Sequence, residues 1–339
     1  MTINFAALQH APRLLMEAKL KPLQGHRFQS TGFADLGPAR YTLHDGTEML
    51  LVESVQSVAN RLELACWDSA SDALIDGLKG LPYIEVTKNN GKESLTNSML
   101  EAHRINSPYI VANKDTTVFD IIKNGTGAAD AAPVDIRGLA KLLLKYDANA
   151  VIHGVFLADG DLAGGRLRLP RLLSGFIEAV DVQLAESGGV KNDRVNPAKG
   201  GEGQTSAEGF GNVPFHRSEF TAREVKAYFN LDLAQLRGYG LGSQATELLI
   251  ALSIFKVRRF LSTGLRLRTA CDLDVDGQLS AQRPADFAIP DEGSLLKACK
   301  ALIEACAGNG DFAKPAVTRI EWKGSRKGGK KAAAKDDDE

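Results

Sequence analysis

The side chains in this sequence that could do chemistry are mainly basic, and they occur in short clusters. The segment 256–268 holds five Lys and Arg residues and no acidic residue. A second cluster, Arg166, Arg168 and Arg171, surrounds Pro170. An Arg guanidinium group can donate two parallel hydrogen bonds to a phosphate. A solvated protein surface explains any one cluster equally well, but several together favour an extended polyanion as the ligand.

Two long polar stretches could carry such contacts. Residues 187–217 contain seven glycines, and residues 87–132 are interrupted by Asn-Gly sequences. Loops of this length are usually functional insertions. Glycine lets backbone N–H groups approach a phosphate closely. The side chains of the first stretch that could add positive charge are Lys191, Arg194, Lys199, His216 and Arg217.

We find no sequence motif for catalysis. The phosphate loop GxxxxGK[ST], the zinc motif HExxH and the nucleophile elbow GxSxG are all absent from the sequence. Gly238, Gly240 and Gly242 hint at a phosphate loop, but no buried strand leads into them, so we interpret them as a helix end followed by a turn. The six histidines lack metal-ligand spacing, and the four cysteines form no CxxC pair. We therefore expect no catalytic residue, no metal and no cofactor.

Composition and charge limit the remaining possibilities. The chain has 339 residues, 44% of them hydrophobic, which suffices for a large globular core. Its 41 Lys and Arg residues oppose 42 Asp and Glu residues, so any nucleic-acid surface must come from local segregation of charge. The apolar stretch 248–255 is far shorter than the roughly 20 residues that span a bilayer, and the N-terminus lacks the order of a signal peptide. We expect a cytoplasmic protein without a membrane partner.

Strands and helices are expected to alternate along the chain and to position these side chains. Apolar residues recur at helical spacing in 54–67, which predicts a helix with one polar face. Thr221 and Glu224 form a capping box that predicts a helix to about residue 236. The other expected elements are helices at 135–146, at 243–261 and after Ser294, and strands at 48–53, 150–157, 178–184, 265–275 and 316–322. Interspersed elements of both kinds favour an α/β or α+β fold.

Four segments of the sequence resemble one protein family. They are LLVESVQSVANRLE (50–63), HRINSPYI (103–110), SGGVKNDRVNP (187–197) and EGFGNVPFHRSEFTA (208–222). In combination they resemble the large RAMP-superfamily protein of type I-G CRISPR systems, formerly called type I-U. That protein is similar to the backbone subunit of Cascade complexes. The resemblance extends from about residue 10 to residue 322 and excludes the charged tail.

The resemblance implies an α+β fold, namely a ferredoxin-like (RRM-like) palm with finger-like and thumb insertions. Residues 1–322 would form a single RAMP-type domain. Within it, 87–132 would be the finger-like insertion and 187–217 the thumb-like, glycine-rich insertion. Residues 323–339, in which six basic residues precede four acidic ones, would be a disordered charged tail.

The resemblance also implies a function in antiviral defence that is not enzymatic. The protein would polymerise along CRISPR RNA, forming a filament with further copies of itself and binding other Cascade subunits. It would present the guide for pairing with target DNA. A guide of arbitrary sequence must be held through phosphate and ribose, because base pairing and not the protein supplies specificity.

The predicted RNA-binding residues are basic or polar. The helix at 54–67 would contribute its polar face and the free N–H groups at its N-terminus. Arg61 on this face is expected to be exposed, so that its removal weakens RNA binding and leaves stability nearly unchanged. The full predicted set is Arg27, Gln56, Ser57, Asn60, Arg61, His103, Arg104, Arg166, Arg168, Arg171, Lys191, Arg194, His216 and Arg217.

The alternative function is a RAMP-type ribonuclease that acts on CRISPR RNA or on guide-paired RNA. Its candidate residues are Asp35, in the segment GHRFQSTGFADLG, and His26. Arg27 beside His26 would supply the cation that a metal-free histidine mechanism needs near the phosphate. A third possibility is a general RNA-binding protein outside defence, which the specific combination of motifs disfavours.

Overall fold

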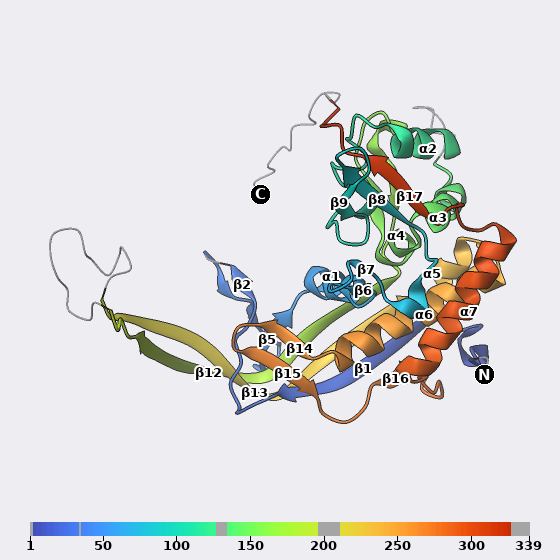
Figure 1. The fold of residues 1–339 in the computed structure, drawn as a ribbon. Helices are drawn as coiled ribbons and strands as arrows, with labels where there is room; N and C mark the ends of the chain where they lie inside the picture. Colours follow the sequence, from blue (N-terminus) through green and yellow to red (C-terminus); the bar gives the residue numbers. More distant parts are fainter. Residues whose placement is uncertain (1–2, 34, 127–133, 196–210, 327–339) are drawn as a thin grey trace.

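The computed structural model describes residues 3–33, 35–126, 134–195 and 211–326. In this part, a large antiparallel sheet carries helices on one face, and a smaller region of short strands and helices lies above it in the view of Figure 1. The mixture of helices with mainly antiparallel sheets agrees with the predicted α+β class. None of the described helices combines the length and the apolar character that a membrane span needs.

The main sheet has the strand order β14-β15-β1-β13-β12-β5-β4, with β16 beside β1, and its pairs are antiparallel. In β1 and in the second half of β13 every second residue is buried, because successive residues of a strand face opposite sides of a sheet. These buried side chains belong to the hydrophobic core. The strands are β1 (Arg13–Pro22), β4 (Arg40–Thr42), β5 (Glu48–Glu53), β12 (Leu173–Lys191), β13 (Val213–Asp232), β14 (Leu265–Arg268), β15 (Cys271–Val275) and β16 (Ser280–Arg283).

Helices cover one face of this sheet. They are α1 (Val55–Leu64), α5 (Leu233–Gly238), α6 (Ser243–Ser262) and α7 (Glu292–Asn309). α6 and α7 lie side by side in Figure 1, and α6 is buried over most of its surface. The GYGLG segment connects α5 to α6, with Gly240 and Gly242 at positive φ, which confirms the helix end and turn predicted there.

The smaller region is built on a three-stranded sheet of order β17-β8-β9, in which β17 and β8 are parallel. Its elements are β8 (Tyr83–Lys88), β9 (Glu93–Asn97), α2 (Thr117–Gly125), α3 (Ile136–Tyr146), α4 (Ala148–His153), the hairpin of β10 (Val155–Leu157) and β11 (Leu167–Leu169), and β17 (Val317–Glu321). The other short described elements are β2 (Gly32–Phe33), β3 (Gly37–Pro38), β6 (Trp67–Asp68), β7 (Ala73–Leu74) and the 3-10 turns η1 (Ala6–Leu8), η2 (Asp76–Leu78), η3 (Arg104–Asn106) and η4 (Ala163–Gly165).

β12 and β13 form a hairpin that extends far beyond the other strands. The two strands stay in one register along their whole paired length. In Figure 1 the distal part of this hairpin projects from the rest of the molecule. We call this part, residues 184–191 and 213–220, the arm.

Both stretches that were predicted as long loops contain regular structure. Both ends of 187–217 belong to the strands of the arm, and residues 196–210 between them lie outside the described part. The stretch 87–132 contains the end of β8 together with β9, η3 and α2. The predicted disordered tail begins at residue 323, but its first four residues are described and contact the smaller region, where Arg326 pairs with Asp159. The rest of the tail lies outside the described residues.

Most of the predicted elements are present. The structure confirms strands at 48–53, 178–184 and 316–322 and helices at 54–67, 135–146 and 243–261, although several of their ends differ. The helix predicted after Ser294 is α7, which begins earlier. Its N-cap is Asp291, whose carboxylate accepts the N–H of Ser294 at 2.8 Å.

Three predicted elements are wrong. The segment 221–236 is not a helix but continues β13 as far as Asp232, because its apolar residues alternate with polar ones. The segment 150–157 is not one strand, because Asp147 accepts the N–H of Ala150 and caps helix α4, which β10 follows. The segment 265–275 is the hairpin of β14 and β15, since Ala270 adopts a φ of 60° and turns the chain.

Candidate nucleic-acid interface

The polar face of α1 is positioned by the cap on its first turn. The Ser54 hydroxyl accepts the N–H of Ser57 at 3.3 Å, which satisfies one of the N–H groups that a helix leaves free at its N-terminus. Gln56 and Asn60 are exposed, and their side chains are hydrogen-bonded to each other at 3.0 Å. Arg171 donates to the Gln56 side chain at 2.8 Å. Three of the predicted residues, Gln56, Asn60 and Arg171, therefore lie together at this face of α1.

Ser57 and Arg61, which were predicted on the same face, turn toward the protein. Both donate to the carboxylate of Glu53, which is 1% exposed, with an Arg61 Nε to Oε1 distance of 3.0 Å. Arg268 of β14 donates to the same carboxylate. The Arg61 guanidinium also donates to the backbone carbonyl of Leu267. Arg61 thus ties α1 to β14, contrary to the expectation that its removal leaves stability unchanged.

We expect Arg61→Ala to lower the free energy of unfolding by about 1–3 kcal/mol. A hydrogen bond to a charged group contributes roughly this much, and the buried carboxylate of Glu53 would lose one of its two cations. Urea unfolding measures the change. Asn60→Ala, on the exposed side of the same helix, is the matched control and should shift stability by less than about 0.5 kcal/mol. Equal stability of the two variants would refute the structural role.

Arg104 was predicted to bind RNA, but its side chain is buried. The residue is 6% exposed and forms a bidentate pair with Glu63, with Nε–Oε1 and Nη2–Oε2 distances of 2.6 and 2.9 Å. It also donates to the carbonyl of Gly154 at 3.2 Å. This pair joins two of the four segments that carry the family resemblance. Arg104 therefore supports the fold and is not accessible to a phosphate, whereas His103 beside it is exposed.

A buried polar network continues from this pair. Asn149 donates to Glu63 at 2.8 Å, and the fully buried Lys256 donates to Asn149 Oδ1 and lies 2.8 Å from His153 Nε2. Burial lowers the pKa of Lys256 and of His153, and it raises the pKa of Asp147 to about 7. Shifted pKa values can mark active sites. Here the groups lie inside the core, so we assign them to the joining of α1, α4 and α6.

The basic cluster at 256–268, which suggested a polyanion surface, is used mainly for packing. Lys256 lies in the core. Arg258 donates to the carbonyl of Pro290 at 3.0 Å, and Arg259 pairs with Glu292 at 2.9 Å. The segment therefore presents less positive charge at the surface than its number of basic residues suggests.

A polar cleft opens where the arm leaves the main sheet. We call it the basal cleft. It has a volume of about 630 Å³ and is lined by Gln29, Ser30, Thr31, Gly32, Gly37, Pro38, Phe215, His216, Arg217, Ser218 and Arg268. At its margin, Arg27 and Arg217 both pair with Glu219, at 3.2 and 3.6 Å. The cleft therefore brings together His216, Arg217 and, through Glu219, Arg27.

Phe215 supplies an aromatic surface to the basal cleft. Its ring lies over Gly189 of the opposite strand, where a Cβ atom would be 3.1 Å from the ring. The guanidinium carbon of Arg217 lies 5.9 Å from the ring centroid. The cleft thus combines guanidinium, hydroxyl and amide groups with one aromatic face. These are the groups that contact the phosphates, riboses and bases of single-stranded RNA.

The remaining predicted residues lie on other elements. Lys191 and Arg194 are exposed near the end of the arm. Arg166 and Arg168 are exposed at the β10–β11 hairpin, where Arg166 also donates to the carbonyl of Ala163 at 2.8 Å. Apart from His103 and the residues that turn into the protein, the predicted set therefore divides among the face of α1, the basal cleft with the arm, and the β10–β11 hairpin.

The sequence analysis missed part of the basal cleft. Gln29, Ser30 and Thr31 line it but were quoted only as part of a possible ribonuclease segment. Their polar types, one residue after His26-Arg27, were a usable signal. Arg268 was counted in a basic cluster, and nothing in its spacing indicates that it reaches both Glu53 and the cleft.

The candidate ribonuclease residues do not meet. His26 lines a separate hollow of about 400 Å³ together with Lys19, Lys21 and Asp276, whereas Asp35 is exposed in the turn between β2 and β3. No hydrogen bond joins His26 to Asp35 in the described part of the chain. Within that part, no group of three or more His, Cys, Asp or Glu side chains is arranged to hold a metal ion.

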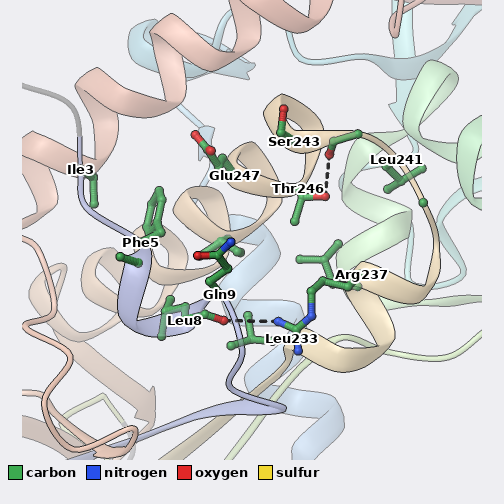
Figure 2. Close-up of a pocket in the computed structure, with 15 residues that line it drawn as sticks. Ile3, Phe5, Leu8, Gln9, Leu233, Arg237, Leu241, Ser243, Thr246 and Glu247 are labelled. Carbon is green, nitrogen blue, oxygen red and sulfur yellow. Dashed lines mark hydrogen bonds between the residues drawn. The ribbon is translucent and has the colours of Figure 1, made fainter.

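A largely apolar pocket of about 620 Å³ lies between the N-terminal segment, α5 and α6 (Figure 2). Two of its polar side chains are engaged within the protein. Arg237 donates to the carbonyls of Leu8 and Ala11 at 3.3 and 2.7 Å, and the Thr246 hydroxyl donates to the carbonyl of Gly242 at 2.7 Å. None of the predicted RNA-binding residues lines this pocket. Its apolar lining does not suit a polyanion.

Residues 14–184 match the model of the family described as CRISPR-associated protein GSU0053. The match covers half of the chain, so the protein belongs to this family. This confirms the CRISPR-associated class that the sequence resemblance implied, while the type I-G subtype stays a prediction. No curated protein matches the chain.

Several solved structures are similar to this chain at low sequence identity. One is a chain of a "CRISPR RNA-guided surveillance complex, pre-nicking", with 13% identity, coverage of 77% of this chain and 76% of that chain, and a TM-score of 0.39. Csc2 from Thermofilum pendens shares 10% identity over 90% and 79% of the two chains, with a TM-score of 0.29. A further "CRISPR RNA-guided surveillance complex" chain shares 11% over 86% and 88%, with a TM-score of 0.27. Because these TM-scores are below 0.5, the family membership rests on the sequence match alone.

Proposed function

We propose that this protein is the RAMP-superfamily backbone subunit of a type I-G Cascade surveillance complex. It binds CRISPR RNA in the cytoplasm, forms a filament with further copies of itself, and associates with other Cascade subunits. It presents the guide for pairing with target DNA. The observation that carries this proposal is the basal cleft, which gathers basic, polar and aromatic side chains in a member of a CRISPR-associated family.

The order of the central strands supports a ferredoxin-like (RRM-like) palm. β15, β1, β13 and β12 are neighbours in this order. In the sequence, α1 lies between β1 and β12, and α6 lies between β13 and β15. A β-α-β-β-α-β succession with this order is expected of that fold. The arm then corresponds to the thumb, at 187–217, and the region of β9 and α2 to the finger-like insertion, at 87–132.

The basal cleft would hold RNA without reading its sequence. Glu219 is buried and positions the guanidinium groups of Arg27 and Arg217, whose side chains are 54% and 33% exposed. A phosphate can approach their outer N–H groups. Because the carboxylate already offsets part of their charge, each contact is weak. Tight binding then requires many such contacts along an extended strand, which is the situation of a subunit in a filament.

We expect the protein to bind single-stranded RNA of any sequence with an affinity that falls steeply as salt increases. Each phosphate neutralised on a single strand contributes about −0.7 to the slope of log K against log salt. Arg217→Gln should make this slope shallower by roughly that amount. The measurement is fluorescence anisotropy with two RNAs of equal length and different sequence at several salt concentrations.

Arg223→Gln is the control for this experiment. Arg223 is exposed on the same strand and pairs with Asp181, but it does not line the basal cleft. It should leave the salt slope unchanged. A strong preference for one of the two RNAs that persists at high salt would contradict sequence-independent binding.

We further propose that the protein is not an enzyme. The test against the ribonuclease alternative is incubation with guide RNA and labelled complementary RNA, with and without Mg²⁺. Cleavage that is lost in Asp35→Asn or His26→Gln would support the ribonuclease instead.

A further inference from the structure

A second aromatic and basic pair lies outside the basal cleft. In the β10–β11 hairpin, Phe156 lies directly opposite Arg168. The residues before and after each of them are buried, so both side chains point away from the core. Phe156 is 55% exposed. Opposite residues of a strand pair have Cβ atoms about 4.5–5.5 Å apart, so the ring and the guanidinium group share one small surface.

This pair has no evident role in the fold. Within the described residues, Arg168 forms no ion pair and no hydrogen bond through its side chain, and the Phe156 ring contacts no other aromatic ring. A single exposed apolar side chain is common on protein surfaces. An exposed ring beside a guanidinium group without a partner is more specific, because together they can stack a nucleobase and pair with a phosphate.

The segment that follows the hairpin contacts the polar face of α1. Arg171 follows β11 and donates to Gln56 and to the carbonyl of Val55, at 2.8 and 3.3 Å. Arg168 and Arg171 therefore lie close along one short segment. Arg171 thus links the segment that carries Arg168 to the polar face of α1. The charge of this segment is thus continuous with a surface that the proposed function already uses.

We propose that Phe156 and Arg168 form a second binding site for single-stranded RNA, distinct from the basal cleft. Phe156 stacks on one base, and Arg168 pairs with a neighbouring phosphate. The inference rests on the proposed function and adds to it a contact with a base. The contact stays independent of sequence, because every base presents a π face. It excludes duplex RNA, whose bases are already stacked on each other.

The test separates base stacking from phosphate binding. Binding of wild type, Phe156→Ala, Phe156→Tyr and Arg168→Gln is measured for oligouridine and for an oligomer of abasic phosphates of the same length. Phe156→Ala should weaken oligouridine binding about tenfold, and Phe156→Tyr, which keeps the ring, should bind like the wild type. Phe156→Ala should not change binding of the abasic oligomer, whereas Arg168→Gln should weaken binding of both.

A crosslinking experiment locates the base. Oligouridine that contains 5-iodouridine is irradiated in complex with the wild-type protein, and mass spectrometry of the digest should find the adduct on Phe156. Leu23→Ala, which removes another exposed apolar side chain, is the control and should not change affinity.

The two proposals fail in different ways. If wild-type protein binds RNA but Phe156→Ala binds equally well and no adduct forms at Phe156, the second site is overturned and the proposed function stands. If wild-type protein does not bind single-stranded RNA at low salt, the proposed function fails and this site fails with it. Equal weakening of oligouridine and abasic binding by Phe156→Ala would also overturn base stacking.

Discussion

Arg104→Leu is expected to lower the free energy of unfolding by about 3–5 kcal/mol. The substitution leaves the carboxylate of Glu63 buried without its cation, and an uncompensated buried charge costs this much. Asn149 would still donate to Glu63, but an amide does not neutralise it. Urea unfolding monitored by circular dichroism measures the change.

The matched control is Arg168→Gln. Both arginines were predicted from the sequence to bind RNA, but Arg168 is exposed, so its replacement should change stability by less than about 0.5 kcal/mol and weaken RNA binding instead. The double variant Glu63→Gln/Arg104→Leu should recover part of the loss, because it removes the unpaired charge. A stable Arg104→Leu variant that no longer binds RNA would show that Arg104 contacts the ligand.

Replacement of residues 190–214 by an Asn-Gly turn is expected to abolish assembly along RNA and to preserve a folded monomer. Gly189 and Phe215 are paired across the hairpin, so a two-residue turn can close the shortened strands. The described residues of the replaced segment contribute nothing to the hydrophobic core. Phe215, with the rest of the basal cleft, is retained.

Size-exclusion chromatography with light scattering, with and without RNA, measures this effect. The mass of wild-type particles should rise with RNA length, whereas the shortened variant should bind RNA without forming a filament. A second variant, in which 190–214 are replaced by Gly and Ser at equal length, separates the reach of the arm from its side chains. Full assembly by the shortened variant would rule out a thumb in this position.

The sequence predicted elements well where the local pattern of apolar residues was clear. α3 has one buried face and clear ends, and β5 is a short apolar run that is buried along most of its length; both were found. The segment 221–236 was misread because Thr221 and Glu224 mimic a capping box inside a strand. β1 was not predicted at all, although its burial alternates. Its main partner is β13, more than 200 residues later, and no local pattern reports such a pairing.

The candidate site was predicted by residue type but not by environment. Arg61 and Arg168 look alike in the sequence, yet Arg61 binds a buried carboxylate and Arg168 is exposed on the β10–β11 hairpin. One signal was present for Arg61. Ser57 and Arg61 are four residues apart on α1, so their side chains lie on one face of the helix, and Glu53 directly precedes the Ser54 cap. Arg104 offered no such signal, because its partner Glu63 lies 41 residues earlier in the chain.

The pairing of β1 with β13 also bears on how the protein is made. Arg13 lies opposite Asp232, so the first strand of the sheet has to wait for residues that leave the ribosome some 200 positions later. At 5–20 residues per second, this delay is about 10–40 s. The other neighbours of β1, in β15 and β16, follow later still. During this interval the nascent chain exposes a strand with one apolar side and unpaired edges, which can pair with other chains. The yield of native protein should therefore depend on how well the cell shields the nascent N-terminus.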